Sequence, residues 1–191
     1  MEVHAYSLDV TSYVGSIQCV SADPVSNWVY VCTNSALFAF LPKNKQGPRP
    51  DAFKLVAGHR VETGFRDGEG EEVRINRPCG ISARSNVILI ADTYNHAIRR
   101  CTSSGKMSTL AGDGQAGCVD GSASRFNLPR GIAWNTSGIY VADCGNNCIR
   151  WVAHKVDHRG TSFRIVTTVA GSGQVNFLYE TVFQVVTKLQ K

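Results

Sequence analysis

Two short segments place an acid, an amide and an arginine at the same spacing. One runs from Asp92 to Arg99 and the other from Asp143 to Arg150. Asp92, Asn95 and Arg99 match Asp143, Asn146 and Arg150, and His96 follows Asn95 where the second segment has Asn147. Repeated acids could form a ring of metal ligands or supply a general base. A catalytic acid needs no second copy, whereas a carboxylate that accepts backbone N–H bonds in a turn recurs with the turn. We therefore predict structural roles for both acids.

The two arginines allow two interpretations. Arg99 and Arg150 could each pair with the acid of their own segment or with a neighbouring unit. Alternatively, they could lie exposed beside Arg100 and Arg130 and form a basic rim suited to phosphate. We favour the structural pairing and keep the rim as the alternative.

A metal centre is the next chemistry to consider. Cys144, Cys148, His154 and His158 provide four candidate ligands in one stretch, and zinc usually takes four ligands. The spacing from Cys148 to His154 is shorter than that of a zinc finger, so we predict no metal and no cofactor. The sequence also lacks the G-x-S-x-G and G-x₄-G-K-[ST] motifs of acyl and phosphoryl transfer. We assign Trp134, Tyr140 and Trp151 to packing, not to base stacking.

A repeat positions these residues. The phrase from Asn76 to Ile81 returns from Asn127 to Ile132, a constant offset of 51 as from Pro78 to Pro129. The strand starts are marked by four repeated residues, Pro78, Gly80, Pro129 and Gly131. Proline presets an extended backbone without needing a donor. Self-similarity at such a period is typical of stacked or radial repeats.

Each unit contains four short runs rich in β-branched and aromatic residues, separated by Gly, Asn, Asp and Ser turns. The predicted strands are 80–83, 87–91, 97–101 and 107–110, then 131–134, 139–142, 148–152 and 163–169. A degenerate unit precedes them, with strands at 16–20, 28–32, 37–40 and 53–57. In it, Thr33 replaces the acid and the Ile-Arg pair is lost. We expect an N-terminal segment 1–15, units at 16–57, 58–111 and 112–171, and a divergent tail 172–191 that favours a strand.

The stretch from Asp92 to Arg99 closely resembles the signature of NHL repeats, whose namesake pair matches Asn95-His96. The passage from Leu110 to Ile132 strengthens the resemblance, which covers residues 55–171 firmly and 16–57 weakly. The resemblance implies an all-β fold, a β-propeller with one four-stranded antiparallel blade per unit. Family members mostly bind proteins or single-stranded RNA, and a few relatives of the same architecture are metal-dependent lyases. His59 and His96 are the repeat-embedded histidines that such a lyase could use as ligands.

The sequence departs from the family in the number of units. Three units are recognisable, whereas a closed propeller needs about four to eight blades. Unpaired strand edges and the apolar sides of terminal blades promote association. We expect a homodimer that closes the ring, or docking onto a protein partner, with this chain as a subunit of the assembly.

Composition and charge limit the remaining classes. The chain has 191 residues, 43% of them hydrophobic, and a net charge of +5. This mild basic bias is compatible with RNA but does not require it. Residues 1–10 resemble no signal peptide and no apolar stretch reaches membrane-spanning length, so we expect a cytoplasmic protein. The seven cysteines fit unpaired thiols of a reducing compartment.

Two segments are candidates for binding. An insertion between the third and fourth strands of the last unit contributes His154, Lys155, Asp157, His158 and Arg159. A basic run contributes Lys43, Lys45, Arg49 and Arg60. Insertions on one face of a repeat protein often carry binding. The predicted function is a non-catalytic interaction module, with single-stranded RNA binding and a metal-dependent lyase or hydrolase as alternatives.

Overall fold

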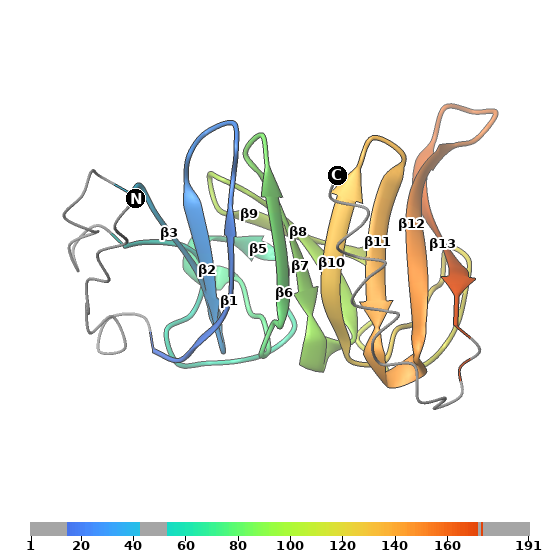
Figure 1. Cartoon of the computed structure of the whole chain (residues 1–191), viewed down its shortest axis with the longest axis horizontal. Helices are drawn as coiled ribbons and strands as arrows, with labels where there is room; N and C mark the ends of the chain where they lie inside the picture. Colours follow the sequence, from blue (N-terminus) through green and yellow to red (C-terminus); the bar gives the residue numbers. More distant parts are fainter. Residues whose placement is uncertain (1–14, 43–52, 172, 174–191) are drawn as a thin grey trace, which may run out of the picture.

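The computed structural model describes residues 15–42, 53–171 and 173, and these form three antiparallel sheets in chain order (Figure 1). The predicted tail strand and most of the N-terminal segment lie outside the described residues. No helix in the described ranges is long and apolar enough to cross a membrane. The fold class is therefore the predicted one, an all-β array of propeller blades.

The first sheet, here blade 1, has the strand order β1-β2-β3-β4. Its strands are β1 (Ile17–Ala22), β2 (Val29–Thr33), β3 (Ala36–Phe40) and β4 (Lys54–Gly58). Blade 2 has the order β5-β9-β8-β7-β6. Its strands are β5 (Gly68–Glu69), β6 (Gly80–Arg84), β7 (Val87–Asp92), β8 (Ala97–Thr102) and β9 (Lys106–Ala111). The short edge strand β5 was not predicted, because its two residues lie in a Gly- and Glu-rich loop.

Blade 3 has the order β10-β11-β12-β13. Its strands are β10 (Pro129–Asn135), β11 (Gly138–Asp143), β12 (Cys148–Val156) and β13 (Ser162–Ala170). Single 3₁₀ turns interrupt the chain at η3 (Gly70–Glu72), η4 (Thr93–Asn95) and η5 (Cys144–Asn146). The turns η4 and η5 each follow the second strand of a blade and end in a left-handed residue, His96 or Asn147.

The blades pack face to face through apolar side chains. One core cluster joins Tyr30 and Leu37 of blade 1 to Ile88 and Ile90 of blade 2. A second joins Leu89 and other residues of blade 2 to blade 3. Because successive side chains on a strand alternate between faces, Ile88 and Leu89 serve different interfaces. The innermost strands β1, β6 and β10 are also neighbours, as Figure 1 shows.

Candidate functional site

The repeated acid of blade 2 lies at the centre of a buried polar network. One oxygen of Asp92 accepts the backbone N–H of Asn76 at 2.8 Å. The other accepts the Asn95 amide at 2.8 Å and the Arg99 guanidinium at 2.7 Å. Arg99 also donates to Asp67 at 2.7 Å and to the carbonyl of Arg66 at 3.0 Å. Asp92 and Arg99 are fully buried, so this pair is part of the interior of the blade.

Blade 3 repeats the network residue for residue. Asp143 accepts the backbone N–H of Asn127 at 2.7 Å, the Asn146 amide at 2.8 Å and Arg150 at 2.9 Å. Arg150 then donates to Asp120 at 2.7 Å. In both blades the second acid, Asp67 or Asp120, also accepts a backbone N–H from β9 or β13, respectively. The network therefore ties the loop before the blade to its second, third and fourth strands.

Burial and charge act in opposite directions on these acids. Burial raises the pKa of Asp92 and of Asp143, while the bonds from the asparagine, the backbone and the arginine lower it. Burial also acts to raise the pKa of Asp120, but the Thr168 N–H and Arg150 outweigh it, so the pKa lies below its usual range. Burial would lower the pKa of Arg150, yet bonding to Asp143 and Asp120 raises it. The acid and the arginine therefore remain charged in the interior only because each is bonded to all of its partners.

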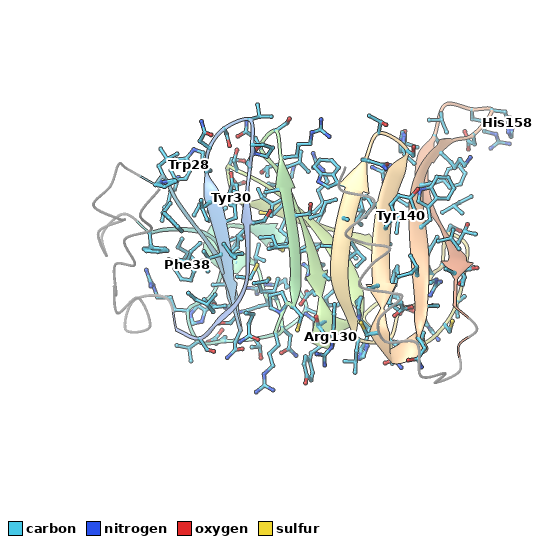
Figure 2. All side chains as sticks on the ribbon, viewed as in Figure 1. Trp28, Tyr30, Phe38, Arg130, Tyr140 and His158 are labelled. Carbon is cyan, nitrogen blue, oxygen red and sulfur yellow. The ribbon has the colours of Figure 1, made fainter. Side chains whose placement is uncertain are left out.

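The structure differs from the sequence interpretation in the backbone partners of the acids and agrees with the favoured structural pairing of the arginines. The backbone N–H groups come from the segment before the blade, sixteen residues upstream, and not from the following turn. Arg99 and Arg150 have no exposed side-chain surface, so they form no basic rim. Figure 2 places Arg130 at one end of blade 3, opposite His158.

Blade 1 replaces the polar network with an apolar one. In each blade, one residue of the third strand pairs with the last alanine of the fourth strand, and Phe38 and Arg99 are the residues that follow it. By strand register, Phe38 therefore occupies in blade 1 the position that Arg99 occupies in blade 2. Phe38 is buried and packs against Phe53 and Leu55. Thr33 stands in the place of the acid and bonds the backbone of Ala36. The same positions are thus filled by an apolar cluster in blade 1 and by a buried polar network in blades 2 and 3.

Hydrogen bonds also join each blade to the next. The Thr93 hydroxyl donates to the Pro129 carbonyl at 2.7 Å. The Leu128 N–H donates to Nδ1 of His96 at 3.1 Å. His96 therefore serves both the turn, with its left-handed backbone, and the interface. Pro78 precedes β6 and Gly80 begins it, whereas Pro129 begins β10 and Gly131 lies within it.

Asp23 forms a contact between blades 1 and 2 that the sequence interpretation missed. Its buried carboxylate accepts the backbone N–H groups of Ser85 and Asn86, in the β6–β7 turn of blade 2, at 3.0 and 2.9 Å. It also bonds Val25 and Ser26 in its own turn. Burial acts to raise the pKa of Asp23, but these four bonds outweigh it and hold the pKa well below its usual range. The signal was an Asp before proline at a strand end, which is also found in ordinary turns.

The predicted binding hairpin protrudes from blade 3. The insertion is an extension of β12 and β13, and Figure 2 shows His158 at its far tip. His154, Lys155, His158 and Arg159 are exposed. Asp157 instead accepts the N–H groups of Arg159 and Thr161, both at 2.8 Å, and shapes the turn.

The basic run is only partly described. Lys43, Lys45 and Arg49 lie outside the described residues. The Arg60 guanidinium lies 5.3 Å from the centre of the Phe38 ring, against the outer face of blade 1. The structure therefore does not bring Arg60 together with the hairpin of blade 3.

The cysteine and histidine set does not converge. Cys144 lies in η5 and Cys148 begins β12, whereas His154 and His158 lie at or beyond the other end of that strand. Six residues of strand span about 20 Å, too far for one ion. Within the part of the chain that the structure describes, no three His, Cys, Asp or Glu side chains could hold a metal ion. All seven cysteines are unpaired thiols.

A groove of about 280 Å³ lies between blades 2 and 3. Blade 2 contributes Leu89, Arg100 and Leu110 among its lining residues, and blade 3 contributes Trp134, His154, Arg164 and others. A smaller groove of about 180 Å³ lies at the interface of blades 1 and 2. The binding-site prediction included His154 but neither arginine, because their proximity depends on how blades 2 and 3 stack.

The fold and the two networks define an array of β-propeller blades. No family model matches the sequence. NHL repeat-containing protein 2 from Bos taurus is 40% identical over 109 residues, and its Homo sapiens counterpart is 35% identical over the same length. SUPPRESSOR OF QUENCHING 1, chloroplastic, from Arabidopsis thaliana is 38% identical over 94 residues. These likenesses to proteins named for NHL repeats support the resemblance that the sequence shows to that repeat.

The matches cover half of this chain or slightly less, but only 9 to 15% of those relatives' own length. Among solved structures, an auxiliary nutrient binding protein from Bacteroides thetaiotaomicron superposes with a TM-score of 0.58 at 20% identity. That superposition covers 78% of this chain and 36% of the other. At this identity the likeness concerns the propeller fold alone.

Proposed function

We propose that this chain is a non-catalytic protein-interaction module of a larger assembly. The polar residues that recur in blades 2 and 3 are occupied by internal hydrogen bonds, which leaves the blade faces and grooves for recognition. The cytoplasmic placement belongs to the same proposal and is supported by the seven unpaired thiols.

One observation carries the proposal. Leu89, Ala91 and Ile98 of blade 2 pack against blade 3. An offset of 51 relates them to Tyr140, Ala142 and Ile149 of blade 3. These three residues lie on the sheet face opposite Val141, which packs toward blade 2.

That face of blade 3 therefore repeats the apolar positions with which blade 2 binds its neighbour, and Figure 2 shows Tyr140 on β11. Propeller blades are stabilised by packing on both faces. Ala142 and Ile149 are already buried in the single chain and Tyr140 is half-buried. A sheet from a second copy or from a protein partner would therefore contact this face at Tyr140, as a two-fold dimer or a mixed assembly.

The test is the solution mass from light scattering at two protein concentrations. We expect a mass of twice 20.8 kDa for the chain alone, or association with a partner. Tyr140→Glu should abolish the association, whereas Val61→Glu at a fully solvated site should preserve it. A stable monomer that also yields no adduct in cell extract from a photo-crosslinker at position 140 would refute the proposal.

A further inference from the structure

The groove between blades 2 and 3 combines an apolar floor with a concentrated positive charge. Val87, Leu89, Leu110, Ile139 and Val152 provide aliphatic surface, and Trp134 lies beside them. Arg100 of β8, His154 of β12 and Arg164 of β13 line the same groove. His154 and Arg164 are direct cross-strand partners. No acidic residue lines it.

The two arginines have no compensating charge in the described part of the chain. The ion pairs found there involve other arginines. Burial lowers the pKa of Arg164, and the charge of Arg100 lowers it further. Two like charges that are held close together and half-buried repel each other, and an anion bound between them would relieve that repulsion.

The groove between blades 1 and 2 serves as an internal comparison. Strand register places Ala39 where blade 2 has Arg100. An offset of 51 relates His154 to Ser103, and the register of the fourth strands relates Arg164 to Gly105. That groove carries a single lysine, Lys54, among its lining residues. The fold therefore does not require the three basic residues, since an equivalent interface forms without them.

We propose that the groove between blades 2 and 3 binds an acidic peptide segment, with an apolar side chain on the aliphatic floor and adjacent carboxylates on Arg100 and Arg164. The proposal rests on the proposed function and assigns part of its recognition to this groove. Guanidinium groups bind carboxylates through paired, charge-assisted hydrogen bonds. His154, at the rim, adds a further donor.

The lining favours a peptide over RNA. Single-stranded RNA needs aromatic platforms for several successive bases beside its phosphates, and this groove has one aromatic residue among many aliphatic ones. Its volume of about 280 Å³ is at the lower limit of small-molecule pockets. That space suits one or two side chains.

The test uses labelled peptides and fluorescence anisotropy on the full chain. The probe is a fluorescein-labelled Gly-Ser-Gly-Leu-Asp-Asp-Gly-Ser-Gly peptide. Matched controls replace Asp-Asp with Asn-Asn, or Leu with Ser, and a labelled oligouridine tests RNA. We expect the Leu-Asp-Asp peptide to bind about tenfold more tightly than either control.

Protein variants locate the site. R100Q/R164Q should weaken binding of the Leu-Asp-Asp peptide about tenfold or more. Lys54→Gln at the other groove should leave binding unchanged. Circular dichroism monitors folding, and the single variants R100Q and R164Q repeat the test with a smaller change.

Three results would overturn the inference. These are absence of peptide binding, equal binding by R100Q/R164Q, or tighter binding of oligouridine that the same variant abolishes. Association through the face of blade 3 is measured separately by Tyr140→Glu. If the chain associates through that face but binds no peptide, peptide binding in the groove is refuted while the proposed function stands.

Discussion

Replacing Arg99 with phenylalanine tests whether the buried network must be complete. The substitution removes the charged partner of Asp92, which has no exposed side-chain surface, and leaves that carboxylate with the Asn95 amide and one backbone N–H. Removing one member of a buried ion pair costs about 3 to 5 kcal/mol. We expect Arg99→Phe to lower the free energy of unfolding by that amount.

Blade 1 suggests a compensating change. Thr33 and Phe38 fill the positions of the acid and the arginine there. Asp92→Thr combined with Arg99→Phe removes the stranded charge, while the second acid, Asp67, can be hydrated because its side chain is 48% exposed. Replacing a buried pair by apolar groups is often nearly neutral. The double variant should therefore be about 2 kcal/mol more stable than Arg99→Phe alone.

Urea unfolding followed by tryptophan fluorescence measures all the variants in one double-mutant cycle. Arg125→Met is the matched control, since its ion pair with Asp113 is exposed and should contribute little. The reasoning fails if Arg99→Phe unfolds at the same urea concentration as Arg125→Met. It fails equally if the double variant is as unstable as the sum of its two single changes.

Two further predictions concern the contacts between blades. A Cβ added at Gly80 would collide with the carbonyl oxygen of Arg130, whereas at Gly131 it would meet only a methyl group at 3.1 Å. Gly80→Ala should lower the urea midpoint by the equivalent of about 2 kcal/mol or more, and Gly131→Ala should have a much smaller effect; equal midpoints would contradict the contact. Because the pKa of Asp23 is depressed below 3.8, its contribution to stability is complete above that pH and is lost as the pH falls. Asp23→Asn should be less stable at neutral pH but lose less stability between pH values of about 5 and 2, as thermal unfolding would show, and parallel acid profiles would contradict this.

The sequence was sufficient to predict the fold because the repeat carries the same information twice. Strand β11, for example, was predicted as 139–142 and spans Gly138–Asp143. Alternating apolar residues and turns rich in Asn and Gly indicate the individual strands. The constant offset then aligns one blade with another. The acid and arginine positions also follow from that alignment.

The groove could not be predicted in the same way. Arg100, Trp134 and Arg164 are far apart in the sequence, and only the stacking of blade 3 on blade 2 brings them together. The favoured pairing of Arg99 with its own acid is present in the structure, and the alternative basic rim does not form because Arg99 and Arg100 point to opposite faces of one strand. Asp23 has no counterpart in the later units, so the repeat gave no second example of its role.

The bonds from Thr93 to Pro129 and from His96 to Leu128 have an evolutionary consequence. Both run from the turn of one unit to the first strand of the next. A gene duplication of the whole unit that contains Thr93 and His96 would therefore supply a donor and an acceptor together and would leave existing junctions intact. Insertion of a partial unit would break two junctions at once. Growth and loss in this lineage should therefore occur in whole blades.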